Sequence, residues 1–224
     1  MSIFTRIVPA GDSAVLIELG SEIDPMINDQ VYSLASSISK EKITAVIELI
    51  PSYRSLLVSY DPLIAGYAEM QEMMSEIIDR SLDSVEGVAV EAKIIELPVV
   101  YGGEDGPDIE AVAEHSGVSV QDVIDIHSGV DYRVYMIGFA PGFPYLGGLD
   151  ERIAAPRLKT PRLSVPAGAV GIAESQTGVY PNASPGGWQL IGRTAIRLFD
   201  VNRTTPSLIT QGAKVRFVPV NSHD

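Results

Sequence analysis

Residues 164–199 read SVPAGAVGIAESQTGVYPNASPGGWQLIGRTAIRLF, and this stretch decides the fold of the C-terminal half of the chain. Its short apolar runs alternate with clusters of glycine, proline, asparagine and serine, which is typical of short β-strands joined by tight turns. The same pattern continues on both sides of the stretch. The strand candidates are Tyr132–Phe139, Ser164–Ala167, Val170–Ala173, Thr194–Phe199 and Lys214–Val218. Short strands at this spacing favour a closed β-barrel.

Three loops of this half combine a stiff backbone with groups that can bind a ligand. Gly138–Gly148 presents three aromatic side chains among prolines and glycines. Pro156–Arg162 carries two Pro-Arg pairs, and guanidinium forks suit carboxylate or phosphate. Gln176–Gln189 offers an amide, hydroxyls, glycine backbone donors and the only tryptophan, and Arg193 follows soon after it. Glycine and proline in such loops let the backbone approach a ligand closely.

Together the loops predict an apolar pocket with a few convergent polar groups, as in a small-molecule site. The substrate- or anion-binding candidates are Arg157, Arg162, Gln176, Thr177, Tyr180, Ser184, Gly186, Gly187 and Arg193. The candidates for the apolar pocket or a partner surface are Pro141, Phe143, Tyr145, Pro166 and Trp188. Two other interpretations stay open. In the first, the aromatic residues cap the barrel core, and the arginines are solvated or pair with the acidic helices. In the second, the whole set forms a protein interface.

The N-terminal half has the pattern of a small α+β sandwich, in the order β-β-α-β-β-α. The strand-like runs are Ile3–Pro9, Ala14–Leu19, Ile43–Ile50 and Ser55–Tyr60. The pairs Asp24-Pro25 and Asp61-Pro62 each predict a helix start, with aspartate as N-cap and proline at the first helical position. The methionines of the second helix are interpreted as core packing rather than as a cofactor site.

The boundary between the halves is expected at Ser84–Ala89, which gives a small α+β domain over residues 1–88 and a β-barrel domain over residues 89–224. The second domain is expected to begin with a strand at Ala92–Tyr101. Two short helices should follow, at about 108–116 and 120–128.

The three histidines carry no predicted chemistry. His115 and His127 lie near the ends of the two short helices, where an imidazole favours the negative end of the helix dipole. His223 lies in the C-terminal tail, where no role is expected for it. No residue of the chain is assigned as a catalytic nucleophile or base.

Composition excludes several classes of function. The formal net charge of −13 disfavours general nucleic-acid binding, which depends on phosphate neutralisation. The absence of cysteine excludes disulfides, zinc–thiolate sites and thiol nucleophiles, and no metal motif is evident. No phosphate-loop motif occurs, and no apolar run reaches the roughly 20 residues of a membrane helix. We therefore expect a cytoplasmic protein that binds neither nucleic acid nor membrane.

The loop motifs resemble those of the family that contains KipI and the 5-oxoprolinase B subunits, also named allophanate hydrolase subunit 1. The matching segments are Tyr135–Leu146, Val165–Ala173, Gln176–Pro181 and Ser184–Thr194, which occur in the same order. The chain departs from the family pattern at Glu174-Ser175, where a small residue, often glycine, is expected before Gln-Thr-Gly. If that loop lines the pocket, Glu174 changes the charge preference for a ligand.

The resemblance implies a small α/β N-terminal domain followed by a cyclophilin-like β-barrel domain. It also implies two functions. Many members are the B subunit of a bacterial 5-oxoprolinase, a hydrolase in which it works with subunits A and C and which uses ATP to open 5-oxo-L-proline to L-glutamate. Other members inhibit autophosphorylation of a sporulation sensor histidine kinase. Related modules also occur in the carboxyltransferase part of urea carboxylase.

In the enzyme interpretation the chain is a non-autonomous subunit of a heteromeric complex. ATP would be handled by another subunit or by a site with no familiar motif. Arg157, Arg162 and Arg193 would bind the substrate carboxylate. Gln176, Thr177 and backbone donors near Gly186-Gly187 would stabilise developing negative charge.

Overall fold

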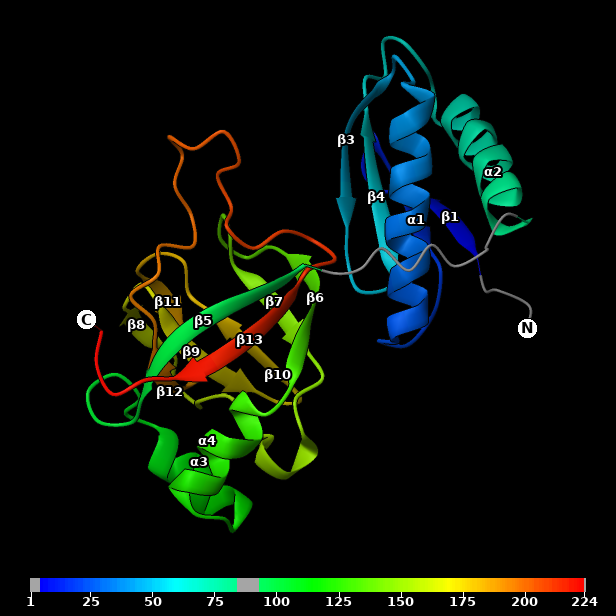
Figure 1. Ribbon diagram of the computed structural model, residues 1–224. Coiled ribbons are helices and arrows are strands. Elements are labelled where there is room, and N and C mark those ends of the chain that lie inside the picture. Colours follow the sequence, from blue (N-terminus) through cyan, green and yellow to red (C-terminus); the bar gives the residue numbers. More distant parts are fainter. Residues whose placement is uncertain (1–4, 84–92, 224) are drawn as a thin grey trace. The chain divides into compact units, whose positions relative to one another are not determined.

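The computed structural model describes residues 5–83 and 93–223, which form two compact units, Met1–Val90 and Glu91–Asp224 (Figure 1). The predicted boundary at Ser84–Ala89 lies outside the described residues. The predicted fold class, a mixture of helices and strands with a closed β-barrel in the C-terminal half, is confirmed. Each unit is described below by itself.

The first unit is a four-stranded antiparallel sheet with two helices. Its elements are β1 Arg6–Pro9, β2 Ala14–Glu18, α1 Pro25–Glu41, β3 Val46–Pro51, β4 Ser55–Tyr60 and α2 Tyr67–Asp83. The strand order is β1-β2-β4-β3, and α1 and α2 pack against each other and against the strands. Met70 and Met74 are fully buried in the core that the helices share with the sheet, so the packing role of the methionines is confirmed.

The two Asp-Pro pairs behave differently. Asp24 caps α1 as predicted, because its carboxylate accepts from the backbone N–H groups of Met26 and Ile27 at 2.7 and 3.1 Å. Asp61-Pro62 begins only a single turn, so the predicted start of α2 is wrong. The helix itself begins at Tyr67. The N–H of Gly66, the residue before it, donates to the Glu69 carboxylate at 2.8 Å.

The second unit is built around a seven-stranded closed barrel. The barrel strands are β5 Ile94–Tyr101, β6 Asp131–Ile137, β7 Pro144–Gly147, β9 Ala169–Ala173, β10 Gln176–Val179, β12 Gln189–Arg193 and β13 Lys214–Pro219. They follow one another around the barrel in the order β10-β7-β6-β13-β5-β12-β9, and β10 pairs with β9. The pair β5–β13 is parallel, whereas the other pairs are antiparallel.

Two strand predictions are corrected by this topology. Residues 194–199 form no strand. The N–H of Thr194 donates to Gly168 O, and its side-chain hydroxyl oxygen accepts from the Ile196 N–H. These two hydrogen bonds turn the chain away from the sheet. Near the strand predicted at Ser164–Ala167, the structure has β8, which spans Arg162–Val165. This strand is not part of the barrel: it pairs with β11 Ser184–Gly186 in a separate two-stranded sheet. β7, β10 and β11 lie inside the segments that were expected to be loops.

The two short helices are close to their predicted positions, as α3 Ile109–Ser116 and α4 Val120–Ser128. Figure 1 shows them together at one end of the barrel. Ser119 and Asp122 form a capping box at the start of α4, in which each side chain accepts from the backbone N–H of the other residue. A 3-10 turn, η1 Glu151–Ile153, packs against both helices.

Candidate functional site

Five aromatic rings gather beside the two-stranded sheet and form what we call the aromatic cluster: Phe139, Phe143, Tyr145, Tyr180 and Trp188. Phe143 lies at its centre, with ring centroids 5.0 Å from Tyr145, 5.2 Å from Tyr180 and 5.5 Å from both Trp188 and Phe139. All four pairs are edge-on, the geometry that aromatic quadrupoles prefer. Three of the five predicted apolar residues are therefore brought together.

Burial divides the cluster into a packed base and an open rim. Phe143 and Trp188 are 1% and 6% exposed, so they serve as core residues at this place. Tyr145 is partly exposed, and Phe139 is 63% exposed. Phe143 and Trp188 are therefore buried, but they belong to a hydrophobic cluster separate from the barrel core that they were expected to cap. Tyr145 and Phe139 remain accessible to a ligand.

Phe139 was missed as a site candidate, and its backbone is unusual. Its φ of 65° is rare for a residue with a side chain. The N–H of Ala140 donates to Gly138 O at 2.7 Å, which closes a three-residue turn around it. A second bond, from Gly138 N–H to Phe143 O at 3.1 Å, ties the turn to the buried ring. The turn therefore holds the Phe139 ring out at the rim, and strain of this kind often marks a functional position.

Tyr180 connects the cluster to the glycine-rich loop. A Cβ at Gly186 would lie 2.4 Å from the Tyr180 hydroxyl oxygen, so only glycine fits there. Burial raises the pKa of Tyr180, and a hydrogen bond to the Trp188 backbone and the charge of Arg157 oppose that rise. Burial also raises the pKa of Tyr145, again opposed by Arg157. Both hydroxyls therefore stay protonated at neutral pH and lie within the electrostatic reach of one guanidinium.

The three predicted anion-binding arginines have different surroundings. Arg162 pairs with the buried Asp108 at 2.6 Å, and Asp108 also accepts from the Leu190 N–H at 2.6 Å. Arg193 pairs with Asp105 at 2.7 Å. Arg157 is exposed and forms no ion pair within residues 5–83 and 93–223. Arg157 is therefore the arginine beside the aromatic cluster whose charge is available to a ligand.

Thr177 lies inside the barrel rather than at its surface. It is fully buried and donates to Gly171 O at 3.0 Å. Its oxygen therefore accepts from His127 Nε2–H at 2.9 Å, and His127 Nδ1 accepts from the Tyr101 hydroxyl at 2.8 Å. Burial lowers the pKa of His127 to about 3, so the imidazole is neutral. The predicted dipole role of His127 is replaced by this internal network.

The remaining candidates flank the cluster. Gly187 accepts from the Leu158 N–H at 2.7 Å, which joins the glycine-rich loop to the arginine loop. Gln176 is partly exposed on β10, and Ser184 is partly exposed on β11. Pro141 and Pro166 are exposed. The roles of these last four residues stay predictions.

Neither a metal site nor a membrane span is seen in the described part of the chain. No group of three or more His, Asp or Glu residues within 5–83 and 93–223 is placed to hold a metal ion. No helix in these ranges is both long and apolar enough to cross a bilayer.

The chain is similar over nearly its whole length to one group of known proteins. The family model described as carboxyltransferase domain, subdomain C and D, matches residues 5–209. A Bacillus subtilis (strain 168) protein, named as the B subunit of 5-oxoprolinase, is 44% identical over 100% of this chain and 96% of its own length. The protein of the same name from Escherichia coli O157:H7 is 43% identical over 93% of each chain.

Two solved structures are similar to this chain. A conserved uncharacterized protein from Pyrococcus horikoshii is 55% identical over 96% of this chain and 98% of its own, with a TM-score of 0.57. The K. lactis urea amidolyase is 22% identical over 98% of this chain and 15% of its own, with a TM-score of 0.78, and shows the fold alone.

Proposed function

This chain belongs to the family of the bacterial 5-oxoprolinase B subunits, and from that premise we propose that it is itself the B subunit of a 5-oxoprolinase. One observation carries the proposal: the 44% identity to the Bacillus subtilis protein extends over the full length of this chain, so both units have a counterpart there.

The proposed complex contains subunits A and C and couples the opening of 5-oxo-L-proline to ATP hydrolysis. The lactam C–N bond breaks, the carbonyl carbon takes an oxygen from water, and the ring nitrogen becomes the amino group of L-glutamate. Hydrolysis of ATP to ADP and phosphate consumes a second water and drives the opening of a stable amide. The role that we propose for this chain is to bind and orient the ring.

Arg157 and the rim of the aromatic cluster fit the two ends of this substrate. The carboxylate of 5-oxoproline matches a guanidinium that has no carboxylate partner among the described residues. The apolar edge of the ring matches Phe139 and the partly exposed ring of Tyr145. Arg162 has a positioning role in this scheme, because Asp108 already neutralises its charge.

The proposal is tested by measuring 5-oxoproline-dependent ATP hydrolysis by the host's A and C subunits, with and without this chain. Activity that requires the chain supports the proposal. Equal activity without it overturns the enzyme assignment, and inhibition of sensor histidine kinase autophosphorylation would then be measured instead.

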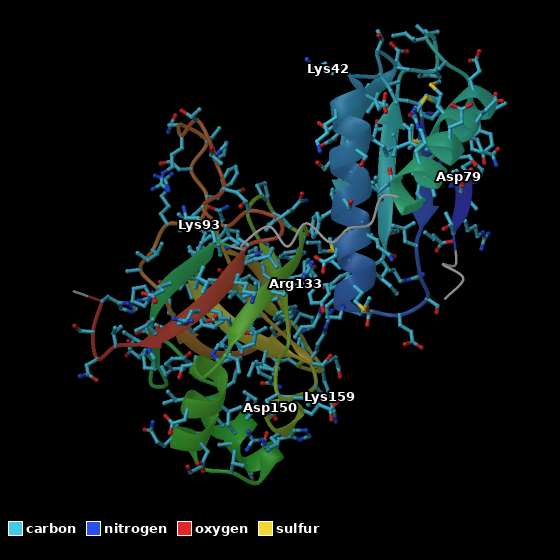
Figure 2. The ribbon with its side chains drawn as sticks, turned by 45° about the vertical axis from the view of Figure 1, so that its right-hand side comes forward. Lys42, Asp79, Lys93, Arg133, Asp150 and Lys159 are labelled. Carbon is cyan, nitrogen blue, oxygen red and sulfur yellow. The ribbon has the colours of Figure 1, made fainter. Side chains whose placement is uncertain are left out.

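The substrate site is tested by Arg157→Gln, with Lys159→Gln as a matched control. Lys159 lies on the same loop and is exposed, at the edge of the barrel unit in Figure 2. Because a hydrogen bond to a charged group contributes about 1.5–3 kcal/mol, Arg157→Gln should lower kcat/KM for 5-oxoproline roughly 10- to 100-fold, mainly through KM. Lys159→Gln should change it less than twofold. Equal effects of the two variants would contradict the assignment of Arg157.

A further inference from the structure

Arg157, on which the proposed substrate site depends, lies in a stretch of backbone without regular structure. Residues 154–161, between η1 and β8, form neither helix nor strand. The Arg157 side chain is exposed and has no ion pair among the described residues. An exposed arginine in such a loop keeps a fixed place beside a ligand only if other contacts hold its backbone.

Two hydrogen bonds hold the peptide groups that meet at the Arg157 Cα. On the N-terminal side, the carbonyl oxygen of Pro156 accepts from the Gln189 side-chain amide, with 2.9 Å between Nε2 and O. On the C-terminal side, the N–H of Leu158 donates to Gly187 O at 2.7 Å. Each bond orients one planar peptide group. Together the two bonds set the direction in which the Arg157 side chain leaves the backbone.

The segment that makes these bonds is itself firmly placed. It runs through Trp188, whose ring lies at the buried base of the aromatic cluster. Gln189 begins β12 and is paired there with β9. Its neighbour Leu190 donates its N–H to the buried Asp108 carboxylate at 2.6 Å. The two hydrogen bonds therefore connect the Arg157 backbone to the base of the aromatic cluster.

The electrostatics of the cluster agree with this connection. Burial raises the pKa of both Tyr145 and Tyr180, and the charge of Arg157 opposes that rise in each case. A guanidinium acts on both hydroxyls in this way only when it is held near them.

We propose that Gln189 is a positioning residue for 5-oxoproline, because it holds Arg157 where the guanidinium can pair with the substrate carboxylate. The inference rests on the proposed function, and Gln189 acts through Arg157 without touching the substrate. Of the two hydrogen bonds, only this one is made by a side chain, since the bond between Leu158 and Gly187 joins backbone groups. The identity of residue 189 therefore decides whether Arg157 is held from both sides.

The kinetic test is Gln189→Met in the reconstituted complex. Methionine keeps the length of the side chain and removes the hydrogen-bond donor. The KM for 5-oxoproline should rise about 3- to 10-fold, as expected for the loss of one neutral hydrogen bond, and kcat should stay within about twofold. The matched control is Gln121→Met, the same change on α4, where the amide donates to Asp125. It should change KM less than about twofold.

A double-mutant cycle tests whether Gln189 acts through Arg157. Once Arg157→Gln is present, adding Gln189→Met should change KM less than about twofold, because the group that it positions is already gone. If the effects of the two changes multiply, Gln189 acts independently of Arg157, and the inference is overturned.

Hydrogen exchange of the Leu158 amide, followed by NMR on the full chain alone, tests the inference without the enzyme assay. Gln189→Met should speed this exchange about tenfold because the loop opens more often, and Gln121→Met should leave it unchanged. Unchanged exchange in Gln189→Met overturns the inference whatever the kinetic result. Faster exchange with an unchanged KM also overturns it, provided that Arg157→Gln raises KM. If Arg157→Gln leaves KM unchanged, the proposed substrate site fails, and faster Leu158 exchange would still support the hold of Gln189 on the loop.

Discussion

His127 shows how a single buried residue can be held in one chemical form. Its ring stacks on Phe217 with centroids 4.5 Å apart, and it is completely buried. Since Thr177 donates to a backbone carbonyl, the hydrogen bonds fix the tautomer with the proton on Nε2. A positive charge on this ring would have no carboxylate partner among the described hydrogen bonds and ion pairs, so the fold requires the neutral imidazole.

This requirement predicts a loss of stability in mild acid. The folded chain binds the His127 proton only near pH 3, whereas the unfolded chain binds it near the ordinary pKa of 6.5. The stabilisation is therefore complete above pH 6.5 and declines as the pH falls toward 3, by about 1.4 kcal/mol per unit. Urea unfolding should show the free energy of unfolding about 2 kcal/mol lower at pH 5 than at pH 7.

His127→Gln should flatten this dependence between pH 5 and 7, although the variant is less stable at both values. His115→Gln, which changes a histidine outside the internal network, should leave the slope as it is in the wild type. An unchanged slope in His127→Gln would show that another group is responsible.

The hairpin β9–β10 illustrates strain at the level of an element. Ala173 pairs with Gln176, so the connection consists of Glu174 and Ser175 alone. Glu174 has a φ of 52°, which glycine adopts easily and glutamate does not. The departure from the family pattern noted in the sequence therefore falls where the turn needs a left-handed residue. Glu174 is exposed, and its N–H donates to Ala155 O.

Glu174→Gly should raise the free energy of unfolding by about 1 kcal/mol, because it removes the left-handed strain and keeps the backbone hydrogen bond. Ser175→Gly is the matched control, and it should lower stability slightly, since glycine adds freedom to the unfolded chain and Ser175 has no positive φ. Thermal unfolding of both variants checks this. A loss of stability in Glu174→Gly equal to that in the control would contradict the strain argument.

Elements with strong local signals were predictable, and those that depend on distant contacts were not. α1 and α4 have side-chain caps that can be read from neighbouring residues. β7 lies in a stretch dominated by glycine and proline, and it is a strand because β6 and β10 pair with it. In the site, the arginines and four of the five aromatic residues could be named from the sequence. Phe139 could not, because its place at the rim depends on a positive φ that the sequence does not reveal. The sequence could not show that Arg157 is available to a ligand while Arg162 is paired. The partner of Arg162, Asp108, is 54 residues away from it in the chain.

At the scale of the whole molecule, the two units have separate cores. Met70, Met74 and the residues around them belong to one hydrophobic cluster, and Phe217 and the barrel residues belong to another. The only tryptophan, Trp188, lies in the barrel unit. Its fluorescence therefore reports the unfolding of that unit, whereas far-UV circular dichroism reports both.

Met74→Ala should lower the stability of the first unit by about 2–5 kcal/mol, because it leaves a cavity in a fully buried position. The circular dichroism transition should shift to lower urea, and the tryptophan fluorescence midpoint should stay in place. Glu72→Ala, an exposed change on the same helix, should shift neither. A shift of the fluorescence midpoint in Met74→Ala would mean that the units unfold together.

The parallel pairing of β5 with β13 has a mechanical consequence. Ile94 lies opposite Lys214, and Val99 lies opposite Pro219. The N-terminal end of β5 and the C-terminal end of β13 are therefore at opposite ends of the ladder. A force that pulls on these two ends is directed along the strands and loads their hydrogen bonds in shear, all at once, instead of unzipping them one by one. The barrel unit should therefore resist stretching, and an unfoldase that pulls the chain from its C-terminal side would load this ladder in shear at an early step.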